Sequence, residues 1–122
     1  MVSQPGAIDP RDLLAVCSTG STVNIALLHE ILGYFVRQNR DRMSIALQAL
    51  ESADRSQLAE VAHAVKGSAA MLGAGHLADL ANRIQLEAAT ASPAALVAGV
   101  LAMRDEFEAV LQTLHAQYPD AF

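Results

Sequence analysis

Near the C-terminus, large apolar residues recur every three or four positions. They are Leu96, Val100, Met103, Phe107, Leu111, Leu114 and Tyr118. An α-helix brings residues at this spacing onto one face, so the stripe predicts a long helix that buries one side against other helices. Ala91-Ser92-Pro93 precedes the stripe and indicates where this helix begins.

The rest of the composition also favours helices. The chain has 122 residues, of which 52% are apolar and 24 are alanine, but only five are aromatic. Alanine loses no side-chain entropy in a helix, and leucine loses little. The sequence therefore predicts an all-α protein, and its length suits one compact domain.

Turn residues divide the first half of the chain into a short and a long helical segment. Asp9 is a candidate N-cap with Pro10 in the first turn, which predicts a short helix that Ser18-Thr19-Gly20-Ser21 ends. The same turn offers an N-cap for a segment from about residue 22 to residue 51. The polar residues 37–42 predict a bend or a solvated stretch, so this segment is either one helix or two.

Two more helices are predicted before the C-terminal one. The first runs from about Gln57 to Leu72, where Gly73-Ala74-Gly75 closes it, and the second runs from His76 to about Ala89. Long helices joined by short loops predict an antiparallel four-helix bundle with a short additional N-terminal helix. We expect a single domain over residues 1–122, with its core at roughly residues 22–118.

The charge balance and the apolar runs exclude several kinds of partner. Eight basic and thirteen acidic residues give a net charge of 8 − 13 = −5 without a Lys/Arg cluster, so we expect no nucleic-acid binding. No apolar run approaches the roughly 20 residues of a membrane span, and the N-terminus lacks a basic region followed by an apolar core. We therefore expect a cytoplasmic protein that binds no membrane.

The cysteine and histidine content argues against a metal site. Cys17 is the only cysteine, so an internal disulfide is excluded, and we expect this residue to be buried at the end of the short helix. A zinc site built from His63 and His76 would need two more ligands at suitable spacing. No glycine-rich phosphate-binding loop is present, so we expect the chain neither to bind ATP nor to phosphorylate itself.

The helix predicted over residues 57–72 carries a histidine on its outer face. Its core face would be formed by Leu58, Val61, Ala62, Val65, Ala69 and Leu72. His63 lies roughly 140° away from that face, ringed by the small residues Ala59, Gly67 and Ala70. Lys66 can bring its ammonium group alongside the imidazole. Since glycine inside a helix costs about 1 kcal/mol relative to alanine, something other than helix stability favours Gly67.

Such a histidine is suited to reversible phosphorylation by a docked protein. A neutral imidazole nitrogen is a good nucleophile near pH 7, and Lys66 could neutralise the charge of the phosphorylated product. Small neighbours would let the active-site loops of a partner approach closely enough for in-line transfer. The alternative is a surface histidine in an alanine-rich helix with a chance glycine.

The residues around His63 resemble a known family. His63-Ala64-Val65-Lys66-Gly67-Ser68, followed by Leu72-Gly73-Ala74, is similar to the signature of histidine-containing phosphotransfer (HPt) domains, His-x-x-Lys-Gly-Ser and then Leu-Gly-Ala. The resemblance includes a leucine-rich helix before the motif and the pair Leu86-Glu87 after it, and it covers roughly residues 22–115. It agrees with the four-helix bundle.

The resemblance implies a phosphorelay intermediate. His63 would exchange a phosphoryl group with the aspartate of a response-regulator receiver domain, beside Lys66 as the phosphate-side cation. Gly67 would clear the approach, and Gln85 on the next helix would be a candidate hydrogen-bond partner of the imidazole. The implied partners are a receiver domain, a hybrid histidine kinase or both. The receiver would supply Mg²⁺, so we expect this chain to bind no cofactor and to act as a phosphocarrier rather than an enzyme.

The chain departs from the family pattern at one position. Many members have a second serine after Ser68, and this chain has Ala69. Because Ala69 lies on the predicted core face, we expect the change to affect packing more than chemistry. One interpretation of Ser68 is that its hydroxyl bonds back to a helix carbonyl. Leu86 projects away from the buried stripe of its helix and is a candidate extension of an apolar docking patch, together with Ala59, Gly67 and Ala70.

Two other interpretations remain open. The chain could be a helical adaptor that docks a receiver or another signalling partner through the same face without carrying phosphate. It could also be the dimerisation and phosphoacceptor module of a histidine kinase, which uses a two-helix hairpin from each of two chains. Since at least four helices are predicted and no nucleotide motif follows them, we expect a monomer that forms the bundle alone.

Overall fold

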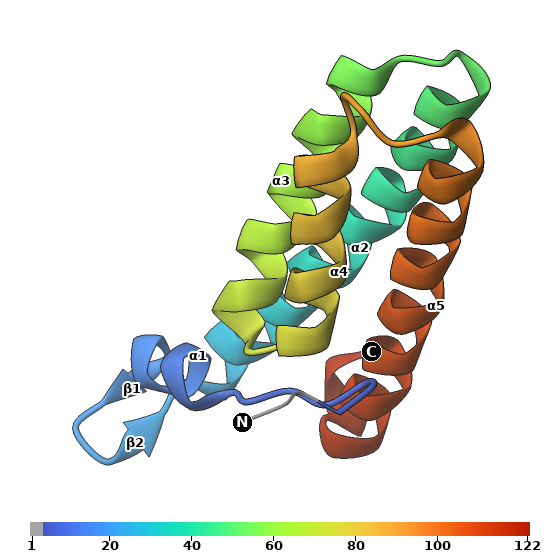
Figure 1. The fold of residues 1–122 in the computed structure, drawn as a ribbon. Coiled ribbons are helices and arrows are strands. Elements are labelled where there is room, and N and C mark those ends of the chain that lie inside the picture. Colours follow the sequence, from blue (N-terminus) through green and yellow to red (C-terminus); the bar gives the residue numbers. More distant parts are fainter. Residues whose placement is uncertain (1–3) are drawn as a thin grey trace.

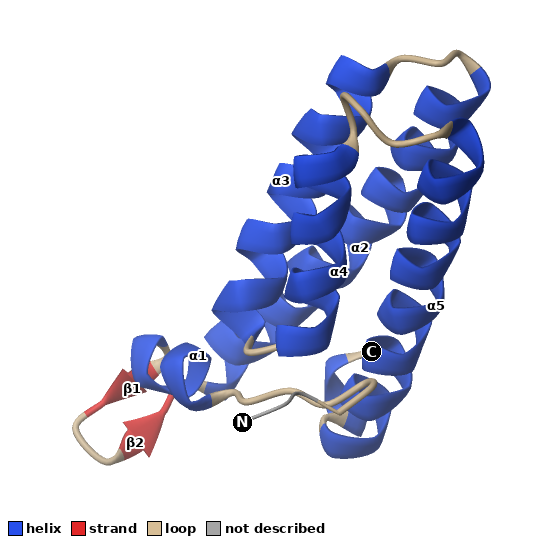
Figure 2. Cartoon of the chain, in the orientation of Figure 1, coloured by secondary structure: helices blue, strands red, loops and turns tan. Residues whose placement is uncertain are grey.

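The computed structural model describes residues 4–122 as a bundle of helices (Figure 1). The helices and strands are α1 (Arg11–Val16), β1 (Ser18–Thr19), β2 (Thr22–Val23), α2 (Ile25–Glu51), α3 (Arg55–Leu72), α4 (Gly75–Glu87), α5 (Pro93–Gln117) and the 3-10 helix η1 (Pro119–Ala121). Figure 2 shows that helices dominate and that the only strands in this part of the chain form one small hairpin. The all-α prediction is confirmed.

Helices α2 to α5 form the bundle, and each runs antiparallel to the next (Figure 1). Both α2 and α4 pack against α3 and α5, which places α2 and α4 at opposite corners. The predicted four-helix bundle with a short N-terminal helix is therefore the observed arrangement. None of the helices within residues 4–122 has the length and apolar character that a membrane crossing requires.

Polar side chains fix where three of the four long helices begin. Asn24, Asp54 and Ser92 each accept a hydrogen bond from the backbone N–H three residues ahead, at 3.0, 2.9 and 3.1 Å. These bonds satisfy amide groups that have no partner inside the helix. Gly73 ends α3 with a φ of 75°, a left-handed conformation that glycine adopts without a steric penalty.

The core is the stripe that the sequence predicted, joined by the facing sides of the other helices. Six of the seven stripe residues in α5 are buried, and Tyr118, just beyond its end, is half-buried. Phe35 of α2 packs against Phe107 of α5, with ring centroids 6.2 Å apart. Two of the few aromatic side chains therefore meet inside the bundle.

The segment before α2 differs from the expectation. Residues 18–23 form an antiparallel hairpin that turns at Gly20, where φ is 63°. Asn24, which follows the hairpin, caps α2 in place of a residue of the turn 18–21. Pro10 occupies the cap position of α1, while Asp9 instead accepts hydrogen bonds from the side chain of Arg11, which lower the pKa of Asp9. The hairpin was not predicted because strands of two residues carry too little pattern to detect. Asp9 does not cap α1 because its carboxylate is engaged by the guanidinium of Arg11.

Helix α2 is continuous, which resolves the choice between one helix and two. The polar stretch 37–42 does not interrupt the helix, and it does not lie wholly in solvent, because Asn39 is fully buried. Cys17 is 2% exposed at the end of α1, as expected.

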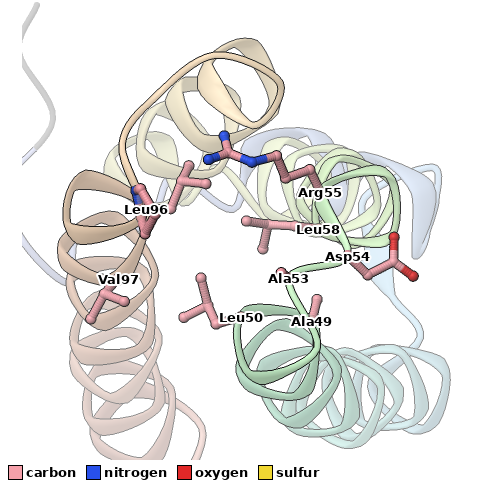
Figure 3. A pocket seen from close by; sticks show the side chains of 9 residues that line it. Ala49, Leu50, Ala53, Asp54, Arg55, Leu58, Leu96 and Val97 are labelled. Atoms are coloured by element: carbon pink, nitrogen blue, oxygen red, sulfur yellow. The ribbon is translucent and has the colours of Figure 1, made fainter.

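Figure 3 shows the end of the bundle where α2 leads into α3 and α4 leads into α5. A small hollow opens there between Leu50, Leu58 and Leu96. The guanidinium of Arg55 donates to the carbonyl oxygens of Ala88 and Ala91 at 2.9 and 2.7 Å. The start of α3 is therefore bound directly to the connection between α4 and α5.

At the other end of the bundle, an N-terminal strap, residues 4–10, crosses the helices. The Gly6 N–H donates to the buried carboxylate of Glu106 at 2.6 Å, and the Thr113 hydroxyl donates to the Gly6 carbonyl at 2.6 Å. The Asp9 N–H donates to the carbonyl of Gly73 at 2.9 Å. The strap therefore joins α5 to the turn that ends α3.

Replacing Glu106 tests the contribution of this strap. Glu106→Ala leaves the buried N–H of Gly6 without its acceptor, so it should lower the free energy of unfolding by about 1–3 kcal/mol in urea denaturation. The control is Glu108→Ala, which removes an exposed carboxylate from the same helix. Equal effects of the two substitutions would show that the strap contributes no stability.

Candidate functional site

His63 projects from the middle of α3 into solvent, as the helical projection predicts. Its Nδ1 lies 3.0 Å from Nε2 of Gln85 on α4, so the two residues are brought together across the groove between α3 and α4. Ala59, Glu60, His63 and Gln85 line an open hollow at this point. Nδ1 of the imidazole thus contacts Gln85, and the other ring nitrogen, Nε2, lies on the opposite side of the ring.

Gln85 has a second polar atom near the site. Its Oε1 is buried and has no hydrogen-bond partner within residues 4–122. A buried carbonyl oxygen without a partner is unfavourable by about 1–3 kcal/mol. If the amide of Gln85 is rotated by 180°, Oε1 takes the place of Nε2 and faces Nδ1 of His63. The Gln85 side chain can therefore donate a hydrogen bond to an unprotonated Nδ1 or accept one from a protonated Nδ1.

The helix surface beyond His63 is bare. Gly67 is exposed one turn later, and a Cβ added to it would have no neighbour within 4 Å. Packing inside the described chain therefore does not require glycine at this position. Ala70 is also exposed, whereas Ala59 is half-buried.

Lys66 lies next to the imidazole on the same helix. It is half-buried, and it forms no ion pair or side-chain hydrogen bond with any residue from 4 to 122. Since side chains three residues apart are neighbours on a helix, its ammonium can reach a group bound to His63.

Leu86 is 73% exposed on α4, next to Gln85 in sequence. Together, α3 and α4 therefore bring His63, Gln85, Lys66 and the small residues to one side of the bundle, with Leu86 on the outer surface of α4.

A buried hydrogen bond between α2 and α3 was not predicted from the sequence. Asn39 of α2 donates from Nδ2 to the Phe35 carbonyl at 2.8 Å and to Ser68 Oγ of α3 at 2.9 Å. Arg42 donates to Asn39 Oδ1 at 3.4 Å. Ser68 thus accepts a bond from another helix, in place of the expected bond to a helix carbonyl. The available signal was the spacing of Asn39, four residues from both Phe35 and Met43 on the buried stripe.

No group of three or more His, Cys, Asp or Glu side chains suited to a metal ion occurs within residues 4–122.

The structure thus presents an exposed histidine beside a bare helix surface, with a lysine that is unpaired within residues 4–122, on a helical bundle formed by one chain. The family model of the Hpt domain matches residues 30–116, well over half of the chain. The chain therefore belongs to the Hpt domain family.

Membership assigns the chain a phosphotransfer role in two-component signalling. Hpt domains are phosphocarrier modules rather than kinases, and they interact with receiver domains and histidine kinases. Comparison with curated proteins and with solved structures returns no match.

Replacing Asn39 tests whether its hydrogen bond to Ser68 stabilises the helix that carries His63. Asn39→Ala removes the donor to Ser68 from a buried position, so it should lower the free energy of unfolding by about 1–3 kcal/mol. Arg40→Ala, an exposed change at the next position, should stay within about 0.5 kcal/mol of the unaltered protein. Urea denaturation measures both, and an unchanged Asn39→Ala variant would contradict a supporting role for the contact.

Proposed function

We propose that His63 reversibly accepts a phosphoryl group from the aspartate of a response-regulator receiver domain and returns it to such an aspartate. The observation that supports this most strongly is the contact between Gln85 and Nδ1 of a solvent-exposed His63, because it leaves Nε2 facing away from the held side of the ring. Nε2 is therefore the proposed nucleophile.

In the proposed reaction the lone pair of Nε2 attacks the phosphorus of the aspartyl phosphate. A P–N bond forms while the P–O bond to the aspartate breaks, and the carboxylate leaves with the bonding electron pair. The attacking tautomer carries its proton on Nδ1. Gln85 stabilises this tautomer when its amide is turned so that the otherwise unpartnered Oε1 accepts from Nδ1–H. Return transfer reverses each of these steps.

The neighbours of His63 have separate roles in this proposal. Lys66 forms no ion pair within residues 4–122, so its ammonium group is available to offset the negative charge of the phosphoryl group. Gly67 and Ala70 leave room for the loops of the receiver around the transferring group. The receiver supplies Mg²⁺ and most of the catalysis, and this chain acts as the carrier.

One chain supplies all four helices of the bundle, which favours a monomeric carrier over the dimeric module of a histidine kinase. A measured mass near 12.9 kDa in solution is the expected result. The alternative is an adaptor that docks a receiver without carrying phosphate, and phosphoryl transfer from a receiver distinguishes the two.

The function is tested by incubating the protein with a receiver domain whose aspartate is phosphorylated. The unaltered chain should gain an acid-labile phosphate, and His63→Gln should gain none. Equal labelling of His63→Gln would contradict the assignment. If no receiver transfers phosphate and receiver binding survives His63→Ala unchanged, the chain is an adaptor.

Two substitutions at Gly67 distinguish the effect of open space on phosphoryl transfer from the effect of glycine on helix stability. Gly67→Leu should slow transfer by about 10- to 100-fold because its side chain obstructs the receiver. Gly67→Ala is the matched control: it should transfer normally and raise the free energy of unfolding by up to about 1 kcal/mol. Ala70→Trp should act like Gly67→Leu. Normal initial rates of transfer in both bulky variants would mean that the bare surface has no role.

A further inference from the structure

An unpaired carboxylate lies beside His63. Glu60 lines the open hollow together with Ala59, His63 and Gln85, and its side chain is exposed. It comes one helical turn before His63 on α3, a spacing at which the Cβ atoms of two residues are about 5–6 Å apart. Within residues 4–122, Glu60 forms no ion pair. A charged group without a counter-charge therefore stands next to the phosphoacceptor of the proposed function.

Glu60 and Lys66 flank His63 on α3 with opposite charges. Each is three residues from His63, which corresponds to about 4.5 Å along the helix axis and about 60° around it, in opposite directions. The bond between Ser68 and Asn39 marks the side of α3 that faces α2. Lys66 is therefore turned toward α4, and Glu60 is turned away from it. Lys66 can offset the charge of a phosphoryl group on the imidazole, whereas the carboxylate of Glu60 can only repel that group.

Neither α2 nor α3 supplies a cation for Glu60. Arg55, at the start of α3, donates to carbonyl oxygens of the connection between α4 and α5. Because α2 runs antiparallel to α3 and Asn39 lies opposite Ser68, Glu60 is level with about residue 47 of α2. The C-terminal third of α2 contains no lysine or arginine. A cation that pairs with this carboxylate therefore has to come from another molecule.

A protein that docks on His63 also covers Glu60. A transient protein complex buries up to about 600 Å² on each partner, which corresponds to a circle of about 14 Å radius. Glu60 lies well inside a footprint of this size centred on His63. Contact with a partner removes water from the carboxylate, and a carboxylate that has neither water nor a cation beside it is strongly unfavourable. A partner therefore loses affinity unless it places a positive charge opposite Glu60.

We propose that Glu60 determines which receiver domains exchange phosphate with this chain, because it selects those that carry a lysine or arginine opposite it. This inference rests on the proposed function and adds to it the charge that the partner surface has to present. Matched charges across a transient interface speed association, and like charges placed opposite one another suppress the wrong partner. A receiver with a neutral or acidic side chain at this place is therefore a poor partner.

Reversing the charge of Glu60 tests this selection. The donor is the receiver that transfers phosphate to the unaltered chain fastest, and initial rates are measured over a range of chain concentrations. Glu60→Lys should need at least about fivefold more chain for half-maximal transfer, because two positive charges would then face each other. The control is Glu108→Lys, which makes the same change of net charge at an exposed position of α5, the helix diagonal to α3 in the bundle. This control should match the unaltered protein.

Phosphoramidate, a small anionic donor that needs no docking, separates the choice of partner from the chemistry of His63. Its P–N bond breaks and ammonia leaves as a new P–N bond forms to Nε2 of the imidazole. Glu60→Lys should be labelled at least as fast as the unaltered chain, because the substitution removes a negative charge that repels the donor. Slow transfer from the receiver with undiminished labelling by phosphoramidate supports the selection. Slower labelling by both donors means that Glu60 acts on His63 itself, which overturns the inference.

A charge swap then identifies the residue of the receiver that meets Glu60. Each lysine and arginine on the receiver surface around its phosphorylated aspartate is replaced by glutamate in turn. At least one of these receivers should transfer phosphate to Glu60→Lys faster than to the unaltered chain. A shift below fivefold, an equal shift in Glu108→Lys, or the absence of any receiver with this reversed preference overturns the selection alone. If neither phosphoramidate nor any receiver labels the unaltered chain, both proposals are wrong.

Discussion

The rotation of α3 about its own axis decides whether its histidine faces a partner or the core. Three features fix that rotation. The inner face of α3 is closed by Leu58, Val65 and Leu72, which are at most 2% exposed. The bond from Asn39 to Ser68 joins α3 to α2, and the contact of Gln85 with His63 joins it to α4. A rotation of α3 by about 100° towards the core, which is one residue, would bring the imidazole to within about 40° of the buried face.

The alanine-rich composition serves two different purposes on this scaffold. Inside the bundle, fully buried alanines allow neighbouring helices to approach closely, and they are Ala46, Ala62, Ala69, Ala74 and Ala81. Outside it, Gly67 and Ala70 leave the helix surface bare beside His63. Small side chains therefore allow the helices to pack closely inside the bundle. In the proposed function, they also allow a receiver to approach His63.

The sequence was most informative where a periodic pattern was long. The stripe of α5 and the core face of α3 predicted the bundle, and the projection of α3 predicted that His63 is exposed. The hairpin at residues 18–23 could not be predicted, because two-residue strands have no measurable period. The turn at residues 18–21 was expected to cap the long helix, but the hairpin delays the start of that helix until Asn24 provides the cap.

Contacts between helices were harder to predict than the helices themselves. Asn39 was interpreted with its charged neighbours as part of a polar stretch, although its spacing from Phe35 matches the buried stripe. Tyr34 of α2 and Met71 of α3 line one surface hollow, which depends on how α2 packs beside α3 and which no pattern within either helix reveals. The resemblance pointed to Gln85, whose own helix gives no reason to single it out.

The identity of the phosphorylated nitrogen tests the central claim most directly. Nuclear magnetic resonance of the ¹⁵N-labelled imidazole, recorded on protein phosphorylated by a receiver, distinguishes phosphorus on Nε2 from phosphorus on Nδ1. Because Gln85 holds Nδ1 at 3.0 Å, the phosphoryl group is expected on Nε2 of His63. Phosphorus on Nδ1, or on any other residue, would contradict the account.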